Sequence, residues 1–148
     1  MSNPAYASPG STVYEPQISD DGRAFPNFDG LSQQWSSGAE YVALFPNLLL
    51  GVHRDHCYGI ILVPDGPNRT IKHAEIYYSQ DAATKSAFAE MRATNTTMWR
   101  DIFVEDVFVV EGMQKGRYSS QYDGGKFSAV MDAPTHHFHK WVATALSG

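Results

Sequence analysis

Four β-prone runs lie close together in the middle of this chain, and their short connections restrict the fold more than any other feature. The runs are Tyr41–Phe45, Leu48–His53, Tyr58–Val63 and Thr70–Tyr78. The residues between them are rich in Pro, Asn, Asp and Gly, which favour turns. Connections this short join antiparallel neighbours, because a parallel crossover needs about a dozen residues or more. We therefore expect residues 41–78 to form an antiparallel meander.

The segments on either side of this meander have a different character. Residues 1–40 are rich in Pro, Gly, Ser, Asn and Asp, which predicts an irregular segment. Its scattered aromatic side chains are expected to hold it against the core: Tyr14, Phe25, Phe28 and Trp35. From Asp81 to residue 148 the apolar period becomes helical. The elements expected there are helices over Ala82–Ala93 and Thr97–Arg117, a turn-rich Ser119–Asp132, and a helix over Thr135–Leu146 opened by Pro134. The fold class predicted is α+β, with the meander packed on a long C-terminal helix.

Composition excludes several classes of protein. A chain of 148 residues with 43% hydrophobic residues can bury one core, so we expect one domain over 1–148. A net charge of −5 argues against nucleic acid or an anionic membrane as the main partner. No apolar run approaches the roughly 20 residues of a membrane span. The N-terminus lacks the features of a signal peptide, and the lone Cys57 fits a reducing compartment, so the sequence predicts a cytoplasmic protein.

Asp106 is the most unusual residue of the predicted helix over Thr97–Arg117. At roughly 100° per residue it falls in the middle of an apolar arc formed by Trp99, Ile102, Phe103, Val109, Val110 and Met113. A buried carboxylate needs a cationic partner or a proton. Arg117 lies on the same arc but three turns away, beyond the reach of a side-chain pair within a helix. A buried ion pair and a metal ion both remain open as explanations.

Two groups of histidines are further candidates for metal binding. His53, His56 and Cys57 offer imidazole and thiolate ligands, although a solvated hairpin end is the expected structure there. His136 and His139 are three residues apart at the start of the last helix and therefore share a face. Together with Asp106 they could form a two-histidine, one-carboxylate set for non-haem iron within this chain.

Several motifs together resemble Rieske-type aromatic-ring-hydroxylating oxygenases, in the catalytic domain of the α subunit. The resemblance covers about residues 25–146. The matching segments are Glu105–Gly116, Leu44–Asn47 with Leu50-Gly51, Pro64–Thr70, Ile76–Tyr78 and His136–Trp141. It implies a helix-grip fold and gives Asp106 the role of the carboxylate ligand of mononuclear Fe(II). It also implies O2, a small organic substrate, a reductase or ferredoxin as electron donor, and a homo-oligomer when intact. The substrate would be an aromatic compound or, in the branch that includes choline oxygenases, an amine.

The chain departs from this family in its metal ligands. The family's two iron-binding histidines lie upstream of anything present here, and its [2Fe-2S] cluster needs two cysteines and two histidines. With Cys57 alone, this chain cannot hold that cluster. We expect a C-terminal portion of a catalytic domain, from a truncated or split gene, that is inert by itself and whose Asp106 is buried with a raised pKa.

A metal-free helix-grip module that binds an apolar ligand is the rival interpretation. It predicts Asp106 in an ion pair with arginine or lysine, beside an enclosed apolar cavity. The oxygenase interpretation predicts Asp106 facing open space.

Overall fold

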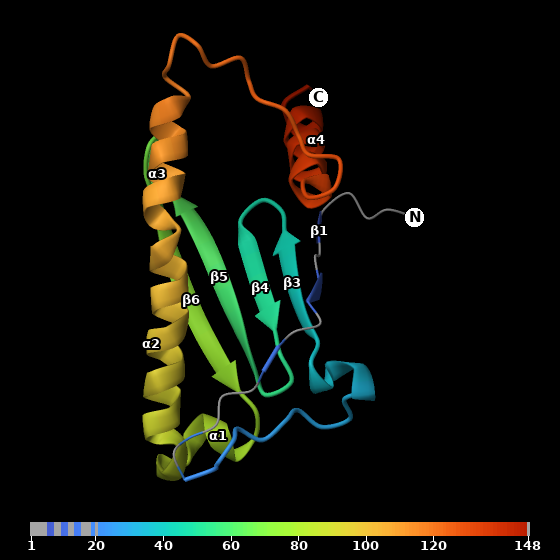
Figure 1. Cartoon of the computed structure of the whole chain (residues 1–148), viewed down its shortest axis with the longest axis vertical. Helices are drawn as coiled ribbons and strands as arrows, with labels where there is room; N and C mark the ends of the chain where they lie inside the picture. Colours follow the sequence, from blue (N-terminus) through green and yellow to red (C-terminus); the bar gives the residue numbers. More distant parts are fainter. Residues whose placement is uncertain (1–5, 8–9, 12–13, 16–18, 20, 148) are drawn as a thin grey trace.

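One antiparallel sheet and one long run of helix make up most of the chain (Figure 1). The computed structural model describes residues 6–7, 10–11, 14–15, 19 and 21–147. The strands are β1 (Tyr6–Ala7), β2 (Gly10–Ser11), β3 (Ala39–Leu44), β4 (Leu48–Val52), β5 (His56–Pro64) and β6 (Thr70–Tyr78). The α-helices are α1 (Asp81–Thr84), α2 (Ala89–Glu105), α3 (Val107–Gly116) and α4 (Ala133–Ser147), and the 3-10 helices are η1 (Gln33–Ser36) and η2 (Ser86–Phe88).

The sheet has the order β1-β3-β4-β5-β6, and β2 also pairs with β3. Every pairing is antiparallel, so the predicted meander over β3–β6 is confirmed. The longest pairing runs from His56 opposite Tyr78 to Pro64 opposite Thr70. Strand β6 has one neighbour in the described sheet and forms its edge.

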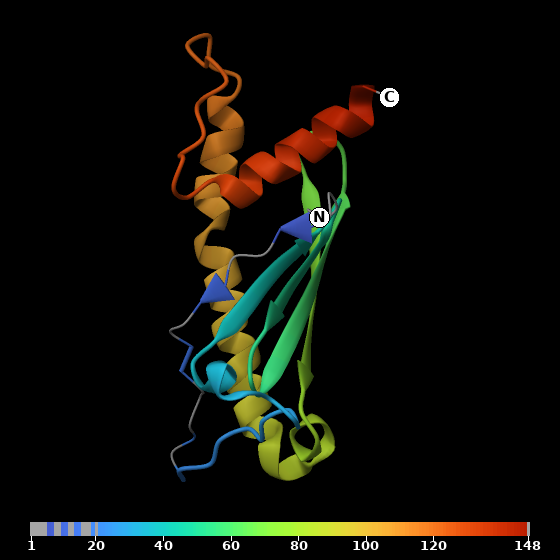
Figure 2. The same ribbon diagram turned by 90° about the vertical axis from the view of Figure 1, so that its right-hand side faces the viewer.

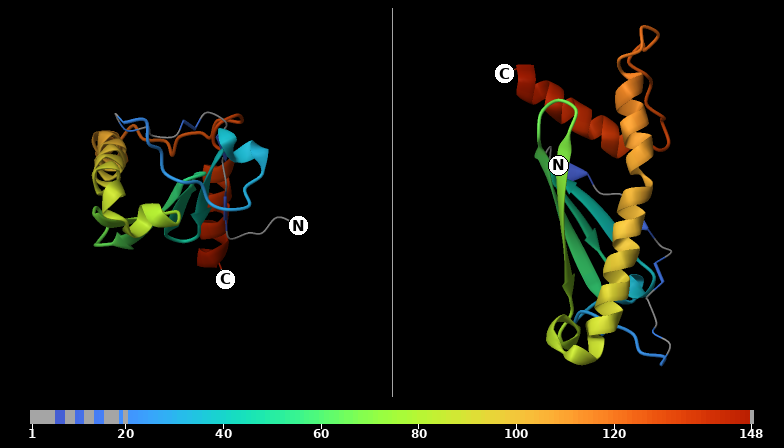
Figure 3. Two further views of the ribbon diagram at one scale, coloured as in Figure 1. Left: turned by 90° about the horizontal axis from the view of Figure 1, so that it is seen from below. Right: turned by 90° about the vertical axis from the view of Figure 1, so that its left-hand side faces the viewer.

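Helix α2 lies along one face of the sheet (Figures 1 and 3). Tyr58 and Ile60 of β5 form a buried core with Trp99 of α2. Residues at alternate positions of a strand point to the opposite face. Ile61 and Tyr77, at such positions, are exposed. The sheet therefore buries mainly the face that α2 covers.

A second core cluster holds the irregular N-terminal segment against the helical end. Phe25 packs with Ala82 and Met91, both of which follow the meander in sequence. Burial of the Phe25 ring confirms that this aromatic side chain anchors the segment.

The helix boundaries differ from the predicted ones in the region after the sheet. The expected gap between helices at residues 94–96 is wrong, because α2 runs through it. Asn95 is buried there and its Nδ2 donates a hydrogen bond to the Tyr78 hydroxyl, at 3.1 Å. Asn95 is a weak helix former, because its side chain often bonds to the nearby backbone instead. Here its side chain bonds to Tyr78, and the helix continues. The helix is interrupted instead at Asp106, between α2 and α3.

Helix α4 crosses one end of the sheet (Figure 2) and lies apart from α2 and α3 (Figure 1). It contacts the loop after β3 through the rings of Phe138 and Trp141, both of which lie against Phe45. The predicted C-terminal helix is thus confirmed and begins two residues earlier than expected. None of the helices in the described part of the chain has the length and apolar character needed to cross a bilayer.

Candidate active site

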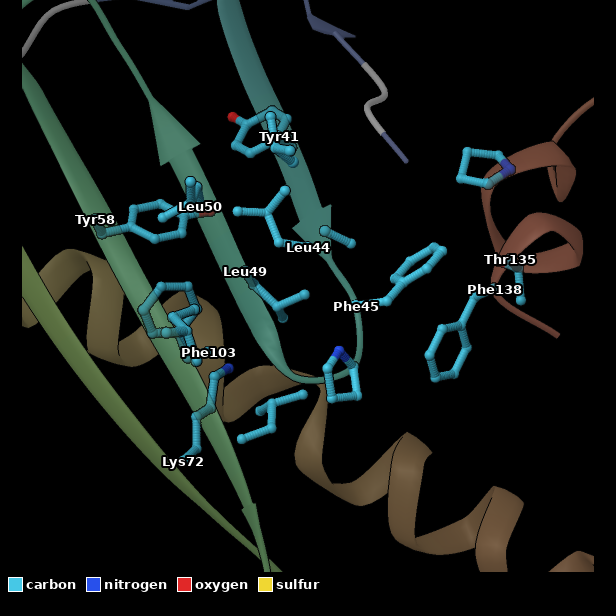
Figure 4. A pocket seen from close by; sticks show the side chains of 16 residues that line it. Tyr41, Leu44, Phe45, Leu49, Leu50, Tyr58, Lys72, Phe103, Thr135 and Phe138 are labelled. Carbon is cyan, nitrogen blue, oxygen red and sulfur yellow. The ribbon is translucent and has the colours of Figure 1, made fainter. Parts of the chain in front are cut away.

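An apolar groove lies between the inner face of the sheet, α2 and the start of α4. Its volume is about 460 Å³, and it is partly open to solvent. This size falls in the range of about 300–1,000 Å³ that is usual for small-ligand sites. Side chains from three regions line it: Tyr41, Leu49 and Tyr58 from the sheet, Phe103 from α2, and Phe138 from α4 (Figure 4).

Lys72 brings a positive charge to this groove. Its side chain extends from β6 toward α2 (Figure 4), and its Nζ lies 4.1 Å from the centre of the Phe103 ring. Partial burial lowers the pKa of Lys72, while the nearby negative charge of Asp106 acts in the opposite direction. Sequence reasoning missed this residue, although Lys72, Ala74 and Ile76 alternate along β6 and so share the face of the sheet that α2 covers.

Asp106 lies one helical turn beyond Phe103, at the break between α2 and α3. The prediction that this carboxylate is buried is wrong, because Asp106 is exposed. The apolar arc is present, but its second half has no cover in the described chain. The exposed members include Val109, Val110 and Met113. Within the part of the chain that the structure describes, the Asp106 carboxylate forms no ion pair with Lys72 or any other cation.

The two histidines of α4 share a face, as their spacing predicts. The rings of His136 and His139 both contact Phe127, with centroids 4.9 and 5.1 Å away. They do not join Asp106: among the described residues, no group of three His, Cys, Asp or Glu side chains could hold a metal ion. A self-contained iron site made of these three residues is therefore not formed.

The His53–Cys57 region is a buried polar cluster, so the expectation of a solvated hairpin end is wrong. His53, Asp55 and His56 are each no more than 1% exposed. The backbone N–H of His53 donates to the carbonyl of His56, and this tight turn stacks the two imidazole rings with centroids 4.6 Å apart. The turn is covered by Trp99 of α2 and by Tyr14 of the N-terminal segment.

Hydrogen bonds define the tautomer of His56 and surround the carboxylate of Asp55 with donors. Trp99 Nε1 donates to His56 Nε2 at 2.8 Å, so the proton of the neutral ring lies on Nδ1. That Nδ1 lies 2.8 Å from Asp55 Oδ1, and the Tyr14 hydroxyl donates to the same carboxylate. Burial alone would raise the pKa of Asp55, but these two hydrogen bonds bring it below the ordinary value. Burial and the adjacent carboxylate raise the pKa of Tyr14.

His53 makes the stability of this chain depend on pH. Burial and the neighbouring His56 lower the pKa of His53 from 6.5 to about 4. His53 is therefore protonated below about pH 6.5 in the unfolded chain, but only below about pH 4 in the folded chain. The stabilisation is complete above pH 6.5 and disappears as the pH falls to about 4, a loss of up to about 3 kcal/mol.

Urea unfolding at half-unit pH steps measures this dependence. His53→Gln is expected to flatten the slope between pH 6.5 and 4. An unchanged slope in that variant would assign the dependence to other groups.

Comparison with known proteins places this chain in a family. The family model for the ring hydroxylating alpha subunit (catalytic domain) matches residues 3–148, and the chain belongs to that family. It is 28% identical over 145 residues to putrescine 2-hydroxylase of Bordetella bronchiseptica, covering 93% of this chain and 31% of the relative. It is 25% identical over 103 residues to the chloroplastic choline monooxygenase of Arabidopsis thaliana, covering 70% of this chain and 24% of the relative. The chain thus spans a third or less of the length of these relatives.

Proposed function

We propose that this chain is the C-terminal portion of the catalytic, helix-grip domain of a Rieske-type oxygenase α subunit. In this proposal, Asp106 is one ligand of a mononuclear Fe(II), and the groove holds the substrate. The observation that carries it is the position of Asp106. Its unpaired carboxylate follows Phe103, a wall of the groove, by one helical turn.

The described residues do not hold iron by themselves. A site of this kind uses two histidines and one carboxylate, and among the described residues no three His, Cys, Asp or Glu side chains come together in this way. We infer that the two histidines belong to sequence outside these 148 residues, as does the domain that carries a [2Fe-2S] cluster. The modest share of each relative that the chain covers supports this inference.

The chain's own contribution would be to bind and orient the substrate. The aromatic and aliphatic walls of the groove bind an apolar group and exclude water from it. Asp106 would place the metal at one end of this site. The complete enzyme would be a cytoplasmic homo-oligomer that uses O2 and electrons from a reductase or ferredoxin to hydroxylate a small organic substrate.

The exposed apolar surface of α3 also supports a larger assembly. Five of its side chains are between 44% and 76% exposed: Val107, Phe108, Val109, Val110 and Met113. The first four residues of α3, Val107–Val110, are all apolar, and an exposed apolar patch of this kind commonly marks a surface that another part of the protein covers. The remainder of the catalytic domain would cover it.

A metal-free ligand-binding module is the second candidate, and the groove is the observation in its favour. That interpretation predicts an enclosed cavity and an ion-paired Asp106. An open groove and an unpaired carboxylate favour the oxygenase proposal.

Iron analysis tests the proposal in two steps. The purified chain, incubated with Fe(II) under nitrogen and desalted, is expected to retain less than about 0.1 iron per chain, because it supplies one of three ligands. A chimera is then made, in which residues 3–148 replace the matching segment of putrescine 2-hydroxylase. It is expected to retain iron, and Asp106→Asn to reduce its iron content at least about tenfold.

Asp101→Asn provides the matched control in the chimera. Asp101 is an exposed carboxylate on the same helix, paired with Arg100, and its loss should leave the iron content unchanged. Stoichiometric iron in the isolated chain, or full iron in the Asp106→Asn chimera, would contradict the proposal.

A further inference from the structure

The groove carries one charge, and that charge is positive. Sixteen of the described residues line the groove, and among these Lys72 alone has a charged side chain. The other polar groups are the hydroxyls of Tyr41, Tyr58 and Thr135. Among the residues that the structure describes, no carboxylate lines the groove. Its electrostatic preference is therefore set by one ammonium group in apolar surroundings.

This ammonium group lacks an acceptor within the described part of the chain. Lys72 Nζ packs over the face of Phe103, and no oxygen of the described residues lies within hydrogen-bonding or ion-pair distance of it. Asp106 acts on it only at longer range. A lysine has three N–H donors, so it can still bind an anionic group of a ligand.

The position of Lys72 also acts against cationic ligands. Aromatic faces attract cations, and Lys72 already occupies one face of the Phe103 ring. A ligand ammonium in the groove would meet the like charge of Lys72 without a lining carboxylate to offset it. A carboxylate would meet an unpaired ammonium beside an apolar surface, where screening by water is weaker.

We propose that the groove binds an organic carboxylate, with its aromatic or aliphatic body against the groove walls and its carboxylate on Lys72. This rests on the proposed function in one respect, that the groove is the substrate site. It assigns this chain a substrate charge opposite to that of putrescine and choline, the amines in the names of its two relatives.

Calorimetric titration of the purified chain with three matched probes tests the proposal. The probes are 2-naphthoate, 2-naphthamide and 2-naphthylmethylamine, which share a ring system and differ in the charge of the head group. At pH 7 and low salt we expect the naphthoate to bind about three- to tenfold more tightly than the amide. The amine should bind most weakly, and salt should reduce the preference for the naphthoate.

Variants of Lys72 show whether this side chain sets the preference. Lys72→Gln should bind naphthoate and amide equally, while its affinity for the amide stays unchanged. Lys72→Arg should keep the preference. Arg69→Gln is the matched control: it also removes a positive charge from β6 and its turn, but Arg69 pairs with Asp65 and lies outside the groove.

Each remaining outcome overturns the proposal. Equal binding of naphthoate and amide by the natural chain, or a preference that persists in Lys72→Gln, excludes Lys72 as the anchor. If the amine binds most tightly, the groove prefers a cationic ligand rather than an anionic one. If none of the three probes binds, the groove is not a site for such ligands. The assay contains no iron, so it is independent of the role of Asp106, which the iron content of the chimera tests separately.

Discussion

Replacing Asp55 by alanine is expected to lower the free energy of unfolding by about 3–5 kcal/mol. The carboxylate is buried, and it accepts hydrogen bonds from His56 and Tyr14. Its removal leaves the buried N–H of His56 and the partly buried hydroxyl of Tyr14 without their acceptor, and breaking a buried pair costs about this much. The loss also releases Tyr14, so the N-terminal segment should become more sensitive to proteases.

Urea denaturation followed by circular dichroism measures the effect of Asp55→Ala. Asp101→Ala is its control, because the Arg100–Asp101 pair is exposed and such pairs contribute between about 0 and 1 kcal/mol. A loss below about 1 kcal/mol for Asp55→Ala would show that the cluster adds little to stability.

Replacing Gly51 by alanine is expected to cost about 2–3 kcal/mol. An added Cβ would overlap the Tyr58 ring. Tyr58 cannot move aside freely, because Trp99 and Phe103 pack edge-on against its ring with centroids 4.7 and 5.3 Å away. The substitution should also distort the groove, since Tyr58 is part of its lining.

Gly59→Ala is the matched control on the adjacent strand. Its added Cβ would meet only Leu50, at an ordinary contact distance of 3.7 Å. Comparison of the two unfolding midpoints separates overpacking from the general effect of alanine in this sheet. Equal midpoints would mean that Tyr58 has room to move.

The meander and the last helix could be predicted because their signals are local. Strand β6 matches its predicted bounds of Thr70–Tyr78, since short turns and β-branched residues define it in the sequence itself. The continuity of α2 through residues 94–96 could not be predicted in the same way. Thr94, Asn95 and Thr96 are weak helix formers, and the helix continues through them because Asn95 bonds to Tyr78, seventeen residues away.

The site residues can also be divided into those that a local sequence pattern reveals and those that only long-range contacts reveal. Asp106 stands out because a charge interrupts an apolar helical period, and this can be seen without a fold. The roles of Lys72 and of the polar cluster of His53, Asp55 and His56 depend on residues that are distant in sequence and contact them only in the folded structure. The sequence predicted solvent around the cluster, whereas Tyr14 and Trp99 cover it from distant parts of the chain.

The sequence by itself determined the order of the four meander strands and the helical character of the segment after them, the placing of Asp106 in an apolar stripe, and the resemblance to ring-hydroxylating oxygenases. These depend on periodicity, turn chemistry and motifs, all of which act over a few residues. The sequence did not predict β1, β2 or η1, which lie in the segment expected to be irregular. The tertiary structure alone decided which polar groups are buried and which charge lines the groove. Burial and electrostatic environment depend on contacts between residues far apart in the chain, and this is why His53 is enclosed while Asp106 is exposed.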